Sequence, residues 1–136
     1  MGESESHIQL VRLLAIEISQ SLLAGNSGLM LVDLPDISAK SKPIMVNNFV
    51  PDVLVPFSPN NIYVIGEAET ARSIEARHTK EQIKAFLSKC AEYEESYFVL
   101  AVPWDMVRLG RAIIKETAIE IGVIGVNTRV LDQLPF

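Results

Sequence analysis

Three acidic residues lie at the ends of two neighbouring apolar segments. Asp52 precedes the first segment, and Glu67 and Glu69 end the second. Side chains alternate between the two faces of a strand, so Glu67 and Glu69 are expected on the same side. A hairpin that turns at residues 58–61 would also bring Asp52 beside Glu67.

Three carboxylates in one small patch repel one another unless a cation lies between them. Hard divalent ions such as Mg²⁺ prefer oxygen ligands, commonly one or two carboxylates together with substrate phosphates. Asp52, Glu67 and Glu69 therefore predict a metal site of the kind found in nucleases. The alternative interpretation is that these acids are solvated at the rim of a sheet.

The same residues resemble the motif of the PD-(D/E)xK nuclease superfamily, which includes restriction endonucleases and Holliday-junction resolvases. Pro51-Asp52 matches its Pro-Asp pair, and Glu67-Ala68-Glu69 matches its Glu-x-Lys element. The resemblance implies a restriction endonuclease-like αβββαβ core. It also implies a nuclease that depends on Mg²⁺ or Mn²⁺ and hydrolyses DNA phosphodiester bonds through a metal-activated water.

The resemblance further implies which residues bind the metal. Asp52 and Glu67 are the expected ligands, and the backbone carbonyl of Ala68 is expected to add another. In this superfamily an acid on the first helix often approaches the metal, and Glu5, with His7 nearby, is the corresponding residue here. A plain preference for negative charge at the helix N-terminus is the alternative explanation for Glu5.

Glu69 occupies the position that the superfamily gives to lysine. A lysine there would orient the attacking water and offset transition-state charge, whereas a glutamate can accept a proton from the water or ligate a metal. Lys80 or Lys84 on the next helix is predicted to supply the missing cation, unless both belong to a solvated helix face. Gln82, followed by Phe86, resembles the Gln-x-x-x-Tyr/Phe signature of several branches of the superfamily. Gln82 is then expected to bond the nucleic-acid backbone or the site carboxylates, or else to be an exposed helix former.

Basic residues after the acidic motif are candidate phosphate contacts, which position nucleic acid without reading its sequence: Arg72, Arg77, Lys80 and Lys84. DNA is accordingly the expected partner. The net charge of -5 argues mildly against binding through the field of the whole molecule. An ordinary solvated surface is the competing interpretation of the same residues.

Composition predicts one domain spanning residues 1–136, with enough apolar residues (49%) for a sizeable core. The one cysteine, Cys90, excludes an internal disulfide and a multi-cysteine zinc site. No apolar run is long enough to span a bilayer, and the first residues lack the layout of a signal peptide. A cytoplasmic protein without a membrane segment is therefore expected.

The first half of the chain is predicted to form one helix and three strands. Ser4 or Ser6 caps the helix, and Gly25 stops it. The second strand is either separate or continuous with Pro51–Val55 through a bend. The predicted ranges are a helix at Glu3–Ala24 and strands at Leu29–Leu34, Ile44–Val50 and Ile62–Glu69.

The second half is predicted to alternate helices and strands. Thr79 is expected to cap a helix through a capping box with Gln82, and this helix buries a stripe of apolar side chains. The next elements are a strand at Tyr97–Val102, a helix from Asp105 to near Gly122 and a strand at Val123–Val126. The buried stripe is Ile83, Phe86, Leu87 and Cys90.

The order of elements predicts an α/β fold with a mixed β-sheet flanked by helices. Two other functions compete with the nuclease. A catalytically inactive nuclease fold would serve as a module for nucleic-acid binding or protein assembly, and Glu69 favours that possibility. A small α/β domain whose acids merely chelate ions or face solvent is the third. A homodimer is expected if the apolar end at Val123–Phe136 forms a dimer surface; the same segment would otherwise cap the core.

Overall fold

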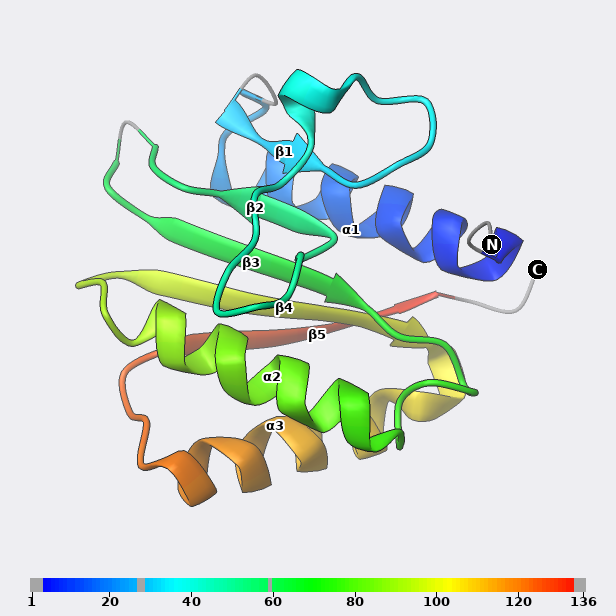
Figure 1. The fold of residues 1–136 in the computed structure, drawn as a ribbon, viewed down its shortest axis with the longest axis vertical. Coiled ribbons are helices and arrows are strands. Elements are labelled where there is room, and N and C mark those ends of the chain that lie inside the picture. Colours follow the sequence, from blue (N-terminus) through cyan, green and yellow to red (C-terminus); the bar gives the residue numbers. More distant parts are fainter. Residues whose placement is uncertain (1–3, 27–28, 59, 134–136) are drawn as a thin grey trace.

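The computed structural model describes residues 4–26, 29–58 and 60–133 and forms a five-stranded mixed sheet between helices (Figure 1). Helix α1 covers one face of the sheet, and α2 and α3 cover the other. The predicted α/β class with a mixed, helix-flanked sheet is confirmed. In chain order the elements are α1 (Glu5–Leu22), β1 (Leu31–Val32), η2 (Ala39–Ser41), β2 (Val53–Val55), β3 (Tyr63–Ala68), α2 (Arg77–Cys90), β4 (Ser96–Pro103), η3 (Trp104–Met106), α3 (Val107–Ile121) and β5 (Asn127–Gln133).

The direction of the strands decides which residues meet at each end of the sheet. The strand order is β1-β2-β3-β4-β5; β1, β2 and β3 pair antiparallel, whereas β3, β4 and β5 run parallel. Val53 at the start of β2 is opposite Gly66 near the end of β3. The residue before β2 and the last residues of β3 therefore lie at the same edge of the sheet.

Gly66 allows α1 to approach β3 closely. A β-carbon at Gly66 would lie 2.9 Å from Cδ1 of Ile18 and 3.0 Å from Cδ2 of Leu14. Both side chains belong to the buried stripe of α1. The absence of a side chain at Gly66 therefore allows α1 to pack closely against β3, beside the sheet edge where Asp52, Glu67 and Glu69 lie.

The predicted limits of α1 are largely confirmed. Ser4 is the N-cap, and its side chain accepts a hydrogen bond of 3.1 Å from the backbone N–H of His7. The helix ends at Leu22, and Gly25 follows with a positive φ of 85°. The N–H of Gly25 donates to the carbonyl of Ser19 over 2.8 Å, which satisfies a carbonyl in the last turn. Glu3, the predicted first residue, lies outside the described residues.

The buried stripe predicted for α2 is confirmed, but the predicted cap is wrong. The helix begins at Arg77, and Ala76 occupies the N-cap position without a side-chain hydrogen bond. Thr79 is instead buried in the first turn, where its hydroxyl bonds Glu69 and the carbonyl of Ser73. The capping-box spacing gave a wrong prediction because Thr79 forms its hydrogen bonds with Glu69 and Ser73 instead of capping the helix.

The predicted strand at Ile44–Val50 is wrong. Val46 and Phe49 form an isolated bridge around Asn47 and Asn48, both of which have positive φ angles. Asparagine tolerates this left-handed conformation better than most residues. The amide of Asn47 donates to the carbonyl of Ala85 over 3.1 Å, which ties the turn to α2.

The predicted last strand at Val123–Val126 is also wrong. Gly122 and Gly125 have φ angles of 71° and 86° and turn the chain between α3 and the sheet. The last strand is instead β5, at Asn127–Gln133. It is a largely polar, half-exposed edge strand, so it lacks the alternation of apolar residues by which a strand is predicted. The predicted helix from Asp105 begins two residues later as α3, after the short turn of η3. No helix in the described part of the chain is long and apolar enough to cross a membrane.

Candidate functional site

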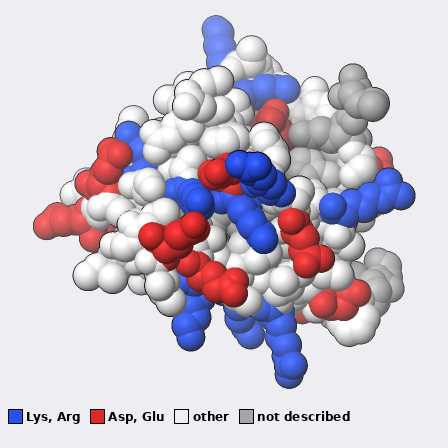
Figure 2. Space-filling model, turned by 60° about the horizontal axis from the view of Figure 1, so that its bottom comes forward, with Lys and Arg blue, Asp and Glu red and all other residues white. Residues whose placement is uncertain are grey.

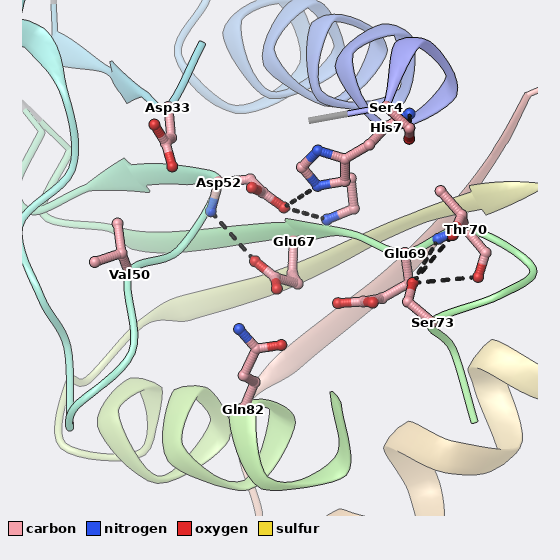
Figure 3. Close-up of a pocket in the computed structure, with 11 residues that line it drawn as sticks. Ser4, His7, Asp33, Val50, Asp52, Glu67, Glu69, Thr70, Ser73 and Gln82 are labelled. Carbon is pink, nitrogen blue, oxygen red and sulfur yellow. Dashed lines mark hydrogen bonds and ion pairs between the residues drawn. The ribbon is translucent and has the colours of Figure 1, made fainter. Parts of the chain in front are cut away.

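A cavity of about 400 Å³ opens at the edge of the sheet where β2 begins and β3 ends (Figure 3). Residues from α1, from the ends of both strands, from the turn after β3 and from α2 line it. The three acids predicted from the sequence to form a site all belong to this lining: Asp52, Glu67 and Glu69. The structure therefore brings together the residues that strand alternation and the hairpin predicted.

Asp52 is fixed by contacts with α1 and with the neighbouring segments of the sheet. Its side chain is buried, with the residue only 6% exposed. Oδ2 accepts the backbone N–H of Ala68 over 2.8 Å and lies 3.3 Å from Nε2 of His7. The carbonyl of Asp52 accepts the N–H of Asp33 over 2.8 Å. These contacts hold the carboxylate between α1 and the end of β3.

Glu67 is a buried acid whose charged form is unfavourable in this cavity. It is 4% exposed, and its Oε1 accepts the backbone N–H of Asp52 over 3.2 Å. Burial raises the pKa of its carboxyl well above the usual value of 4.5, and the charges of Asp52 and Glu69 raise this pKa further. Hydrogen bonds from the protonated carboxyl to Glu69 and Asp52 act in the same direction. The cavity therefore favours either a proton or a cation at Glu67.

Glu69 completes the group from the first residue beyond β3. It is 4% exposed, and its backbone N–H donates to the carbonyl of Ala101 over 3.0 Å. Oε1 accepts the hydroxyl of Thr79 over 3.1 Å. Figure 3 shows its carboxyl directed toward that of Glu67, as expected for residues two apart in extended chain.

The lining is acidic. Besides the three buried acids it includes Asp33, and among the described residues that form it there is no lysine or arginine. Asp33 is partly offset by Lys42, 3.8 Å away, with both side chains about one-third exposed. His7, beside Asp52, is therefore the basic side chain that the described lining offers to the three buried acids.

His7 was not predicted as a site residue, although the sequence contained a signal for it. It precedes the buried residues Leu10 and Val11 by three and four positions, which places it on the inward face of α1. Glu5 lies on the exposed first turn and does not line the cavity, whereas Ser4 and His7 do. The predicted acid from the first helix is therefore replaced in the cavity by a histidine.

Gln82 rises from α2 toward the carboxyl of Glu67 (Figure 3). Phe86, one turn further on, is fully buried against the sheet and packs edge-on against Phe49, with ring centroids 6.4 Å apart. Gln82 therefore lies beside the site carboxylates, which are one of its two predicted partners.

The predicted basic residues lie elsewhere. Lys80, Lys84 and Arg77 line a separate groove of about 490 Å³ between α2 and α3, together with three glutamates. Nζ of Lys84 lies 3.4 Å from Glu120 and 3.8 Å from Glu81. Figure 2 shows basic and acidic side chains interspersed over this face. Neither lysine is placed to supply the cation missing at position 69.

Arg72 is the remaining predicted phosphate contact. It is exposed in the turn between β3 and α2, one residue before Ser73, which lines the cavity. Thr70, also in the lining, bonds Ser73 through its backbone N–H over 2.9 Å. This turn is therefore ordered by its own hydrogen bonds and carries Arg72 close to the cavity wall.

The donor set fits a hard divalent cation bound by few protein ligands. The described residues contain no group of three His, Cys, Asp or Glu side chains arranged around one metal position. Mg²⁺ commonly uses only one or two carboxylates and fills its remaining positions with water and substrate oxygens. Asp52 and Glu67, both carboxylates and both buried, meet that smaller requirement.

Comparison of the chain with protein-family models, with curated proteins and with solved structures finds no match.

Proposed function

We propose that the chain is a PD-(D/E)xK-type nuclease that hydrolyses DNA phosphodiester bonds with Mg²⁺ or Mn²⁺. The observation that carries the proposal is the convergence of Asp52, Glu67 and Glu69, all buried, on one open cavity. Burying three like charges together destabilises the fold unless a proton or cation is bound there. A bound metal ion would offset this unfavourable free energy and would explain why the three acids are buried together.

The fold supports the finer assignment to a restriction endonuclease-like core. A helix, three antiparallel strands, a second helix and a parallel strand follow one another in that order, as in the αβββαβ arrangement. The acids occupy the same places in this order that the Pro-Asp and Glu-x-Lys elements take in the superfamily. The additional strand β5 extends the sheet beyond β4, and α3 lies between these two strands in the chain.

Asp52 and Glu67 would hold the cation, and Ala68 lines the same cavity. The N–H of Ala68 points to Asp52, and in an extended strand the N–H and C=O of one residue point to the same side. Its carbonyl is therefore expected on the same side of β3 as Asp52. A bound Mg²⁺ or Mn²⁺ would polarise the phosphate and lower the pKa of a water molecule.

The remaining side chains would act on water and substrate. Glu69 cannot offset negative charge in the transition state as a lysine would. Its role is therefore to accept a proton from the attacking water. Gln82 has an amide that donates hydrogen bonds to a phosphate oxygen or to the Glu67 carboxyl. Arg72 would contact a neighbouring phosphate from the rim.

The alternative is a catalytically inactive nuclease fold that binds nucleic acid or assembles with proteins. Two observations favour it. Glu69 stands in place of the lysine, and Lys80 and Lys84 lie in the groove between α2 and α3. Such a module would retain the cavity and its metal affinity without cleaving DNA.

Cleavage of plasmid and branched DNA in Mg²⁺ or Mn²⁺ separates the two functions. We expect the wild-type chain to cleave DNA. Asp52→Asn and Glu67→Gln should each lower the rate at least about 100-fold, because losing even an outer-shell partner of a metal costs up to that much and these residues would bind the metal directly. Asp36→Asn, which makes the same charge change at an exposed site, is the control. A wild-type protein that binds Mn²⁺ but leaves every DNA intact would favour the inactive module.

A further inference from the structure

Thr79 contacts Glu69 from the interior of the molecule. The residue is 2% exposed and lies in the first turn of α2. Its hydroxyl donates to Oε1 of Glu69 over 3.1 Å and also lies 2.6 Å from the backbone oxygen of Ser73. Both potential acceptors are fixed, one at the end of β3 and the other in the turn that follows it.

A hydroxyl has one proton and satisfies one acceptor fully at a time. The carbonyl of Ser73 also accepts the backbone N–H of Ala76 over 3.0 Å. The carbonyl therefore keeps a donor when the Thr79 proton turns to Glu69. A hydrogen bond to an ionised carboxylate is about twice as strong as one between neutral groups, so an ionised Glu69 attracts this proton.

The bond to Thr79 fixes which part of Glu69 faces the cavity. Oε1 is engaged on the α2 side, and the backbone N–H is engaged by Ala101 of β4. The carboxyl lies in the cavity and points toward Glu67 (Figure 3). Ser73, whose carbonyl is the second acceptor, lines the same cavity. Thr79 therefore contacts both Glu69 and the turn that forms part of the cavity wall.

We propose that Thr79 is a positioning residue that holds Glu69 at the angle needed to take a proton from the attacking water. This inference rests on the proposed nuclease function. The water loses its proton to Glu69 and forms the new bond to phosphorus. The bond from phosphorus to the leaving sugar oxygen breaks, and that oxygen takes a proton from solvent. The lysine of the superfamily motif is then replaced by a glutamate and a threonine acting together.

The test compares two substitutions of the same residue. Thr79→Val keeps the shape of the side chain but removes the hydroxyl, whereas Thr79→Ser keeps the hydroxyl. We expect Thr79→Val to lower kcat about 10–100-fold with KM changed less than about twofold, and Thr79→Ser to stay within about threefold of wild type. Thr117→Val, at another buried threonine, controls for the general effect of losing a buried hydroxyl.

A combined variant separates positioning from a structural effect. If Thr79 acts through Glu69, then adding Thr79→Val to Glu69→Gln should cost no further activity. The proposal is overturned if Thr79→Val behaves as wild type, if Thr79→Ser is equally impaired, or if the two losses multiply in full.

Failure of the nuclease function itself would be visible separately, as a wild-type chain that cleaves no DNA. Crystal structures of the two Thr79 variants then decide the positioning role alone. A Glu69 carboxyl that turns away from the cavity in Thr79→Val, and stays in place in Thr79→Ser, supports it. A carboxyl unmoved in both variants contradicts it.

Discussion

Ionisation of Glu67 is unfavourable in the folded protein. Its pKa in the folded state is raised above the usual value by burial and by the neighbouring charges of Asp52 and Glu69. A raised folded pKa contributes stability that is complete below the unfolded pKa and is lost as pH rises through the folded pKa. The metal-free protein should therefore lose stability as the pH rises above about 4.5, where the carboxyl ionises in the unfolded chain, until the pH passes the raised pKa of folded Glu67.

Glu67→Gln should stabilise the metal-free protein at neutral pH. Glutamine keeps an oxygen for the N–H of Asp52 and removes the charge. We expect a gain of roughly 0.5–3 kcal/mol at pH 8 that shrinks toward pH 4, measured by urea unfolding across the range. Glu75→Gln, at an exposed position, should give no such pH-dependent difference. A variant less stable than wild type at pH 8 would refute the role assigned to the buried charge.

Metal binding should displace a proton from Glu67. A cation beside the carboxyl offsets the charges of Asp52 and Glu69 and so lowers the Glu67 pKa. Calorimetric titration of Mn²⁺ in buffers of different ionisation enthalpy measures the proton released. We expect release near neutral pH in the wild type and much less in Glu67→Gln. Equal release by both proteins would assign the proton to another group.

The residues of the site could be predicted unevenly from the sequence. Asp52, Glu67 and Glu69 followed from alternation along β3 and from pairing with β2, which are local rules. The place of His7 depends on the rotation of α1 against the sheet, and the role of Thr79 depends on a contact with Glu69 ten residues away. Lys80 failed as a site residue because α2 turns that side chain toward α3.

At the scale of elements, the contact between α1 and β3 positions the cavity. Gly66→Ala should cost about 1–3 kcal/mol of stability, because the added methyl group would meet Ile18 and Leu14. Ile18→Val removes the nearest atom, Cδ1, so the double variant should lose less than the sum of the two single losses. Urea unfolding of the four proteins measures this coupling. Strictly additive losses would mean that the two side chains do not meet.

The elements that the sequence predicted correctly are those with strong apolar patterns. The stripes of α1 and α2 and the continuous apolar run of β4 marked buried elements directly. The turn at Asn47 and Asn48 resembled a strand because Val46 and Phe49 flank it, although its form depends on two left-handed residues. Strand β5 was missed because its pairing with β4, rather than any apolar pattern, makes it a strand.

At the scale of the whole molecule, charge decides how DNA could bind. The chain has a net charge of -5, and the described lining of the cavity contains acids but no lysine or arginine. The phosphate backbone would therefore be repelled without bound cations. We expect measurable affinity for short DNA in Ca²⁺, followed by fluorescence polarisation, and its loss in EDTA. Equal affinity in both conditions would place the DNA on another surface.

If Asp52 and Glu67 hold a divalent cation, a crystal soaked in Mn²⁺ should show it. We expect an anomalous-scattering peak in the cavity, about 2.1 Å from oxygens of both carboxylates, the distance typical of small divalent ions. The peak should be absent in Asp52→Asn. Density found only among the glutamates between α2 and α3, with the cavity holding water alone, would mean that Asp52 and Glu67 are not the metal ligands.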